Sequence, residues 1–167
     1  QAKERAFVDD VTGAYNARYL FTALDHEIRR AERYGSQLTL LFLDIDRFKL
    51  VNDSHGHLVG SRTLRRLAEV LGSCIRQVDT LARYGGDEFV AICPSVVTYE
   101  SAARLAHRLI SELEAPFGVG QDRVRVSASV GVALSEDRCD TPDEVVRDAD
   151  AALYQAKAGG SGTFAVY

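Results

Sequence analysis

The sequence has no methionine and only three cysteines, and it has neither a block of basic residues nor an apolar run long enough to cross a membrane. Cys74, Cys93 and Cys139 are far apart and lack the Cys-x-x-Cys or Cys/His spacing of a metal site, so we expect reduced thiols in a cytoplasmic protein. The net charge of −4 and the scattered basic residues argue against a nucleic-acid partner and against contact with an anionic membrane.

The 167 residues have the length and the apolar content of one globular domain. The chain opens at Gln1 rather than at a methionine, so we expect a domain cut from a longer protein. We interpret residues 1–8 as the end of a linker helix from a missing upstream region, and residues 9–167 as the domain itself.

Apolar spacing predicts four helices. Asn16 is suited to cap a helix that ends near Gly35, apolar residues at helical spacing indicate a helix over 64–75, and Pro116 ends a third helix. The last helix has the clearest start, because Thr141-Pro142-Asp143-Glu144 is a capping box with proline in the first turn.

Strand patterns lie between these helices. The apolar run 38–43 predicts a central strand buried on both faces and ending at Asp44. Residues 81–93 predict a β-hairpin with Gly85-Gly86 at its tip, 124–132 alternate as a strand, and 164–167 suit an edge strand. Together the patterns predict an α/β fold with a mixed central sheet flanked by helices.

Two aspartates at the predicted sheet suggest a metal site. A carboxylate at the end of a buried strand is costly unless it is paired or bound to a cation, and Asp44 ends such a strand, with Asp46 on the same face. Asp44 alone is readily explained by a salt bridge, and a Gly-Gly-Asp turn by ordinary turn chemistry. Because the strand and the hairpin are expected to be neighbours, however, Asp44 and Asp87 can share a divalent ion, and oxygen ligands suit Mg²⁺.

Residues 47–60 are polar and rich in turn formers, and we interpret them as a loop. The Lys49 side chain is suited either to bind a phosphate group or to extend into solvent. His55 and His57 have no third nitrogen or sulfur ligand nearby, so we expect structural hydrogen bonds and no catalytic role.

Taken together, the motifs resemble the GGDEF family of cyclic-dinucleotide synthases over almost the whole chain. The matching motifs are Asp10-Val11-Thr12-Gly13 with Asn16, Leu43-Asp44-Ile45-Asp46-Arg47-Phe48-Lys49 with Asn52-Asp53, Gly56-His57 with Gly60, Arg83-Tyr84-Gly85-Gly86-Asp87-Glu88-Phe89, Ser129-Val130-Gly131-Val132-Ala133, and 149–157. The resemblance implies a fold like that of class III nucleotidyl cyclases and polymerase palm domains. It also implies that a bacterial homodimer condenses two nucleoside triphosphates, under the control of an upstream sensor or receiver domain.

The resemblance assigns a role to individual residues. Asp44, the backbone carbonyl of Ile45, and Asp87 would hold Mg²⁺, two ions per active site with Mn²⁺ as an alternative, and Asp87 or Glu88 would assist deprotonation of the attacking 3′-hydroxyl. Asn52 and Ser61 would meet the base. The phosphates would be held by the backbone amides of Arg47, Phe48 and Lys49 together with the ammonium groups of Lys49 and Lys157.

Two positions depart from the family pattern. Ser61 stands where the family usually has aspartate, which only accepts hydrogen bonds and therefore favours guanine, whereas a serine hydroxyl donates or accepts. Serine here resembles the family's hybrid promiscuous subgroup, so we expect cyclic GMP-AMP from GTP and ATP beside cyclic di-GMP. Ser161 replaces an arginine that many members carry, so a phosphate contact is expected to be missing there.

Arg76-Gln77-Val78-Asp79 resembles the family's Arg-x-x-Asp product-inhibition site, which implies that the cyclic dinucleotide product binds there. A local salt bridge is the other reading of this pattern. Arg104 and Arg108 are both candidates for an additional arginine in that site.

Besides the promiscuous synthase, we keep three alternatives: a synthase strictly specific for GTP, a cyclic di-GMP receptor that uses Arg76 and Asp79 without catalysis, and a plain interaction domain. The paired acids Asp44 and Asp87 argue against the last.

Overall fold

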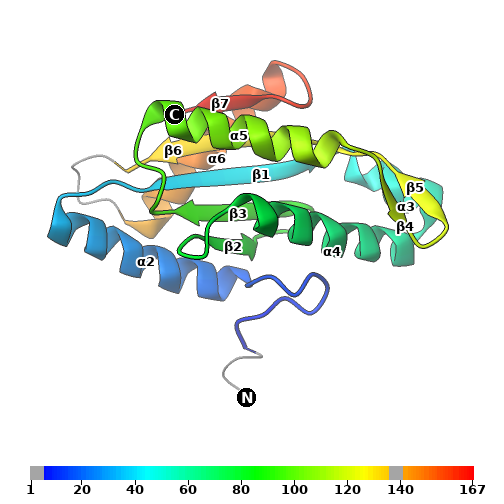
Figure 1. Cartoon of the computed structure of the whole chain (residues 1–167), viewed down its shortest axis with the longest axis horizontal. Coiled ribbons are helices and arrows are strands. Elements are labelled where there is room, and N and C mark those ends of the chain that lie inside the picture. Colours follow the sequence, from blue (N-terminus) through cyan, green and yellow to red (C-terminus); the bar gives the residue numbers. More distant parts are fainter. Residues whose placement is uncertain (1–5, 136–140) are drawn as a thin grey trace.

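The computed structural model describes residues 6–135 and 141–167, and it places a central sheet between two layers of helices (Figure 1). The helices are α2 (Ala17–Tyr34), α3 (Phe48–His55), α4 (His57–Cys74), α5 (Tyr99–Glu114) and α6 (Pro142–Ala158). The strands are β1 (Thr39–Asp46), β2 (Thr80–Arg83), β3 (Glu88–Cys93), β4 (Phe117–Val119), β5 (Asp122–Val124), β6 (Ser127–Leu134) and β7 (Phe164–Val166).

The main sheet has the strand order β2-β3-β1-β6-β7, with β1 at its centre. β1 is antiparallel to both of its neighbours, and β7 runs parallel to β6 at one edge. The sheet is therefore mixed, as the sequence predicts, and its central strand is the predicted apolar run. The end of β1 lies beside the start of β3, where Asp44 is paired with Glu88.

Alternate residues of β1 belong to two different cores. Leu41 and Leu43 pack in one cluster with apolar residues of α4 and α5, whereas Leu40 and Phe42 pack in a second cluster with residues of α2 and α6. A strand covered on both faces is apolar throughout, which explains the unbroken run in the sequence.

The predicted caps of α2 and α6 are confirmed. The Asn16 side chain accepts a hydrogen bond from the backbone of Tyr19 at the start of α2, and Gly35 ends that helix in the left-handed conformation. Thr141 accepts from the backbone N–H of Glu144 at the start of α6. None of the helices in the described parts of the chain is both long and apolar enough to cross a bilayer.

Several predictions about secondary structure are wrong. α4 begins at His57, so residues 57–60 are helix rather than loop, and β1 continues past Asp44 to Asp46. Residues 48–55, interpreted as part of a loop, form α3, because Phe48 and Val51 are buried against the core and this packing outweighs the weak helix propensity of the polar residues that follow. The single strand expected over 124–132 is divided: β5 ends at Val124 within a short β4–β5 hairpin, and β6 begins at Ser127.

The remaining expectations concern the N-terminus and the cysteines. Residues 6–8 form a turn and a β-bridge between Val8 and Tyr15 rather than a helix, and residues 1–5 lie outside the described residues. Cys74 and Cys93 are free and buried, and burial raises the pKa of both thiols. Cys139 lies outside the described residues.

Candidate active site

The tip of the hairpin is a turn over residues 84–87, which joins β2 to β3 and is called the acidic turn below. The backbone N–H groups of Tyr84 and Gly85 both donate to the carbonyl of Glu88, at 2.8 and 3.4 Å. The Tyr84 ring packs edge-on against Phe42, with 5.1 Å between the ring centroids. The acidic turn is thus attached to the sheet at its start.

Asp87 lies beside the end of β1. The N–H of Ile45 donates to the Asp87 carbonyl at 3.0 Å, and the Asp44 carboxylate lies close enough for its charge to act on the Asp87 carboxyl group. Burial raises the pKa of Asp87, and the negative charge of Asp44 raises it further. The strand end and the acidic turn therefore bring together the two carboxylates that the sequence singled out.

Lys157 extends from the last turn of α6 and forms an ion pair with Oδ2 of Asp44. Burial disfavours the charged ammonium, but the hydrogen bond to Asp44 and the nearby carboxylates outweigh it and raise the pKa of Lys157. The other carboxylate oxygen, Oδ1 of Asp44, is buried and has no hydrogen-bond partner among residues 6–135 and 141–167. A buried carboxylate oxygen without a donor is costly, and a cation would satisfy it.

The position of Lys157 depends on close contact between α6 and β6. A Cβ atom added at Gly131 of β6 would lie 2.8 Å from the Cα of Leu153 in α6, which is closer than real Cβ contacts allow. The missing side chain therefore permits the helix to approach the sheet and to place Lys157 over the end of β1.

Glu88 begins β3 and belongs to the same charged group. Burial raises the pKa of Glu88, and the charges of Asp44, Asp87 and Asp150 raise it further. Its carboxyl group lies against Gly85, because a Cβ atom at that glycine would be 3.1 Å from the Glu88 Cδ.

Asp46, which shares a face of β1 with Asp44, has a different role. Its carboxylate accepts hydrogen bonds from the hydroxyls of Ser127 at 2.8 Å and Ser129 at 2.7 Å and from the N–H of Gly162 at 3.1 Å. These donors occupy both of its oxygens. Through Asp46, the segment before β7 is linked to β1 and β6.

A divalent cation fits this donor set. Asp44 and Asp87 supply two close carboxylates, one of them with an unsatisfied oxygen. Within the described chain, no three His, Cys, Asp or Glu side chains gather as a metal site. A cation here would therefore need backbone, water or substrate oxygens as well, and this is the kind of incomplete protein shell in which Mg²⁺ is commonly held.

A cavity of about 420 Å³ opens beside the acidic turn, and it brings most of the predicted substrate residues together. It is lined by Phe48, Lys49, Asn52, His57, Gly60, Ser61, Leu64, Arg83, Gly86 and Asp87. Gly60 leaves room for the Asn52 side chain in this position, because a Cβ atom there would lie 2.9 Å from the Cγ of Asn52. His57, for which we expected only a structural role, lies in the wall of this cavity.

Arg47 and Ser161 lie on a neighbouring cavity of about 510 Å³, which Asp46 and Arg125 also line. Arg47 has a positive φ of 54° and directly precedes α3. The first amides of that helix lack partners within it, so α3 begins with free donors suited to an anion.

Arg76 and Asp79 lie away from these cavities, between α4 and β2. Asp79 accepts hydrogen bonds from the backbone N–H of Arg76 at 2.9 Å and from the Ser95 hydroxyl at 2.9 Å. The Arg76 side chain is exposed and forms no ion pair with any described residue, so the alternative of a local salt bridge is wrong. Arg76, Asp79, Arg104 and Arg108 line one cavity of about 350 Å³.

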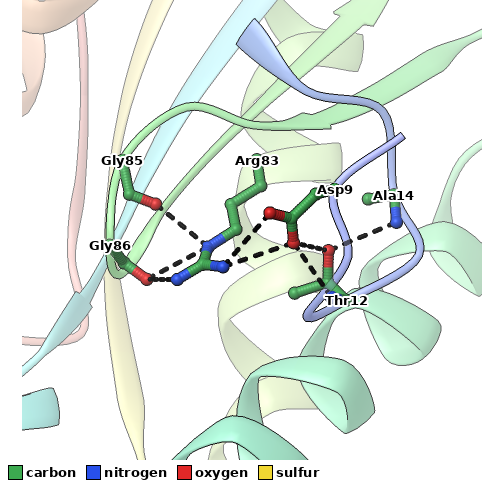
Figure 2. Close-up of polar contacts among 6 residues, drawn as sticks. All are labelled: Asp9, Thr12, Ala14, Arg83, Gly85 and Gly86. Atoms are coloured by element: carbon green, nitrogen blue, oxygen red, sulfur yellow. Dashed lines mark hydrogen bonds and ion pairs between the residues drawn. The ribbon is translucent and has the colours of Figure 1, made fainter. Parts of the chain in front are cut away.

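Local sequence patterns assign no role to Arg83 or Asp9, yet their side chains meet beside the acidic turn (Figure 2). Arg83 ends β2, and Asp9 lies in a turn that precedes α2. The Asp-x-x-Thr spacing from Asp9 to Thr12 indicates a local turn, but a contact between residues 9 and 83 depends on the fold and has no local signal.

Comparison with known proteins identifies the family. Residues 6–163 match the family model described as diguanylate cyclase, GGDEF domain. The chain is 39% identical over 160 residues to the response regulator PleD of Caulobacter vibrioides and 38% identical over 172 residues to the cyclic di-GMP phosphodiesterase PdeR of Escherichia coli. These matches cover 94% and 100% of this chain, but only 35% of PleD and 25% of PdeR.

Among solved structures, the coiled coil and GGDEF domain of DgcB from Caulobacter crescentus, in complex with c-di-GMP, superimposes with a TM-score of 0.92 at 29% identity. The match covers 100% of this chain and 88% of that one. It confirms the predicted fold, a mixed sheet flanked by helices of the nucleotidyl cyclase and polymerase palm kind. On the strength of the family model and of its relatives, the chain belongs to the diguanylate cyclase GGDEF domain family.

Proposed function

We propose that this domain condenses two nucleoside triphosphates into a 3′,3′-cyclic dinucleotide with release of pyrophosphate. The observation that carries the proposal is the meeting of Asp44 and Asp87 beside the cavity that contains Lys49, Asn52 and Ser61. Family membership supports the reaction but does not by itself establish it, since the relatives include a protein named as a phosphodiesterase.

Asp44, Asp87 and the carbonyl of Ile45 are the residues that would hold Mg²⁺. When bound with a nucleotide, Mg²⁺ neutralises phosphate charge and lowers the pKa of an oxygen ligand. Two ions per site, with Mn²⁺ as an alternative, agree with the need to assist both the attacking hydroxyl and the leaving pyrophosphate.

The other residues bind, orient and move protons. The first amides of α3, at Arg47, Phe48 and Lys49, and the ammonium groups of Lys49 and Lys157 hold the β- and γ-phosphates. The raised pKa values of Asp87 and Glu88 suit these carboxylates to accept a proton from the 3′-hydroxyl of the attacking nucleotide.

Asn52 and Ser61 face the base, and Ser61 sets its identity. Aspartate at this position would repel the bare ring nitrogen of adenine, whereas a serine hydroxyl donates to it or accepts from guanine. Losing a bidentate base contact removes roughly 1–3 kcal/mol of discrimination. We therefore infer that ATP competes with GTP and that cyclic GMP-AMP forms beside cyclic di-GMP.

Each cyclic product needs two nucleotides, and the cavity of about 420 Å³ belongs to one chain. We infer that two copies of the domain face each other, each with one triphosphate bound. The specific activity should then rise with protein concentration and level off once the dimer is saturated.

The test is incubation of the purified chain with Mg²⁺ and with GTP, ATP or an equimolar mixture, followed by mass spectrometry of the products. We expect cyclic di-GMP from GTP and both cyclic di-GMP and cyclic GMP-AMP from the mixture. The matched variant Ser61→Asp should shift the mixture toward cyclic di-GMP by about 5- to 100-fold. Cyclic di-GMP alone from the wild-type chain would support the strict diguanylate cyclase instead.

The absence of any product would contradict the enzyme and leave the receptor alternative. Two observations favour a cyclic dinucleotide site at Arg76: its guanidinium is exposed, and Arg104 and Arg108 line the same cavity. Guanidinium groups stack on guanine and donate to its edge and to phosphate. In an active enzyme, the same site would serve product inhibition.

A further inference from the structure

Arg83 uses each of its guanidinium nitrogens to connect two turns (Figure 2). Its Nε donates to the carbonyl of Gly85 at 3.1 Å and to that of Gly86 at 3.2 Å, and its Nη2 donates to the carbonyl of Gly86 at 2.7 Å. On the other side, Nη1 lies 3.3 Å from both carboxylate oxygens of Asp9. The Arg83 and Asp9 side chains are only 16% and 20% exposed, so solvent screens this ion pair less than one on the open surface.

These contacts restrain the backbone of Asp87. A peptide group is planar, so hydrogen bonds to its carbonyl restrain the orientation of the whole plane. Arg83 holds the plane before Asp87 through the carbonyl of Gly86, and the N–H of Ile45 holds the plane after it through the carbonyl of Asp87. With both flanking planes restrained, the φ and ψ angles of Asp87 are restrained, and so is the direction of its Cα–Cβ bond.

Side-chain packing does not provide this restraint at Gly86. A Cβ atom added at Gly86 would have no heavy atom within 4 Å apart from its own chain neighbours. Two adjacent glycines have wide backbone freedom. The hydrogen bonds from Arg83 therefore limit the freedom that the absent side chains leave.

Asp9 is itself held firmly. Its carboxylate accepts hydrogen bonds from the N–H of Thr12 at 2.9 Å and from the hydroxyl of Thr12 at 2.7 Å, while its own N–H donates to the carbonyl of Ala14 at 2.7 Å. A second link joins the same segment to β2, because the N–H of Arg83 donates to the carbonyl of Tyr15 at 2.8 Å. The turn over residues 9–14 is thus a rigid support for Arg83.

We propose that Asp9 is a positioning residue for the reaction: it orients Arg83, which in turn holds the acidic turn so that Asp87 faces Asp44. This inference rests on the proposed function, since Asp87 must act in catalysis for its direction to matter. A misplacement of about 1 Å in a reacting group can cost about 100-fold in rate, so a support outside the cavity can control turnover.

The decisive variant is Asp9→Asn, which keeps one oxygen for Thr12 and removes the charge that holds Arg83. The matched control is Asp10→Asn, at the exposed neighbouring position. With GTP and Mg²⁺, we expect Asp9→Asn to lower kcat about 10- to 100-fold and to change the KM for GTP less than about threefold, because Asp9 does not line the cavity. Asp10→Asn should keep kcat within about twofold of wild type.

Two further measurements separate positioning from general destabilisation. Adding Asp9→Asn to Arg83→Lys should lower kcat by less than about twofold beyond Arg83→Lys alone, because the two residues act in one chain of contacts. Hydrogen exchange of the Ile45 amide, which donates to Asp87, should be at least about threefold faster in Asp9→Asn than in Asp10→Asn, while amides in the middle of β6 should exchange equally in both.

A folded Asp9→Asn chain with wild-type kcat would overturn the proposal, and so would wild-type exchange at Ile45. Because the exchange experiment needs no turnover, it tests the positioning of the acidic turn even if the wild-type chain makes no cyclic dinucleotide. That last result would count against the proposed function alone.

Discussion

Lys157 forms an ion pair with Asp44 although 113 residues separate the two in the sequence. The ammonium group occupies one oxygen of a carboxylate whose other oxygen is buried without a hydrogen-bond partner in the described parts of the chain. Lys157 therefore neutralises the charge of Asp44 in the metal-free domain. A bound cation would compete with the Lys157 ammonium group for the same carboxylate.

This competition predicts opposite effects of one substitution. Lys157→Gln should raise the affinity of the nucleotide-free domain for Mg²⁺ by about three- to tenfold, because a competing cation is removed, yet it should weaken GTP binding because a phosphate contact is lost. Calorimetric titrations with Mg²⁺ and with GTP measure the two effects. Lys49→Gln is the matched control: it should weaken GTP binding and leave the Mg²⁺ affinity unchanged. Equal Mg²⁺ affinities in both variants would contradict the competition.

The raised pKa of Asp87 predicts that this residue reduces the stability of the metal-free domain. A carboxyl group with a higher pKa in the folded chain than in the unfolded chain binds its proton more tightly when folded, so its ionisation costs stability at neutral pH. The cost disappears as the pH falls through the raised pKa and below the ordinary value of 3.8.

Asp87→Asn should therefore raise the melting temperature at pH 7, without metal, by about 1–3 °C, and this gain should vanish near pH 3. The same variant should lose about 10²–10⁴-fold in turnover. Thermal unfolding by circular dichroism at both pH values measures the first effect, with Asp10→Asn as a control that should not change the melting temperature. A lower melting temperature at pH 7 would show that Asp87 is not repelled by its neighbours.

The two glycines of the acidic turn should respond differently to alanine. In Gly85→Ala, the new methyl group displaces the Glu88 carboxyl group, so kcat should fall about tenfold or more while the domain remains folded. In Gly86→Ala, the methyl group meets no protein atom but lies in the wall of the substrate cavity, so the main change should be a higher KM. Steady-state kinetics with GTP distinguish the two, and a reversed pattern would contradict the placement of Glu88.

Close packing at Gly131 predicts a loss of stability when a methyl group is added. Gly131→Ala would force the backbone of α6 away from β6, which should cost about 1–3 kcal/mol or more of unfolding free energy. Gly72→Ala in α4 is the opposite case: the added methyl group meets nothing, and the helix should gain about 0.5–1 kcal/mol. Urea unfolding measures both, and a neutral Gly131→Ala would show that α6 can move outward freely.

The cavity at Arg76 is the proposed site for inhibition by the product, and one substitution tests it. Arg76→Ala should remove inhibition by added cyclic di-GMP and leave the initial rate within about twofold of wild type, because Arg76 lies outside the substrate cavity. Initial rates at increasing product concentration measure this. Inhibition equal to that of the wild-type chain would place the product elsewhere.

Local patterns were sufficient to predict the central strand, the hairpin and the helix caps, because each depends on residues close together in the sequence. α3 could not be predicted in this way, because its stability comes from the burial of Phe48 and Val51 in a core that other elements build. The division between β5 and β6 was missed for a related reason: Val124 and Val126 are buried like strand residues, although only the first lies in a strand.

Local sequence patterns predict only some of the contacts in the candidate site. Asp44 and Asp87 could be paired from the sequence because Asp44 follows a recognisable apolar run and Asp87 lies in the turn of a recognisable hairpin. Asp9 and Arg83 could not, since their contact joins two segments that local patterns do not place together. Asp46 is equivalent to Asp44 by strand periodicity, and contacts with distant residues distinguish the two: Asp46 accepts from Ser127 and Ser129 of β6, whereas Asp44 pairs with Lys157.

The three donors around Asp46 mean that this neighbouring aspartate is not available to replace Asp44 as the proposed metal ligand. Asp46 is two residues from Asp44 on the same face, but its oxygens are already engaged by two hydroxyls and one amide. A genetic selection that starts from an inactive Asp44→Ala strain should therefore yield true reversions at codon 44, with no suppressors that recruit the neighbouring aspartate.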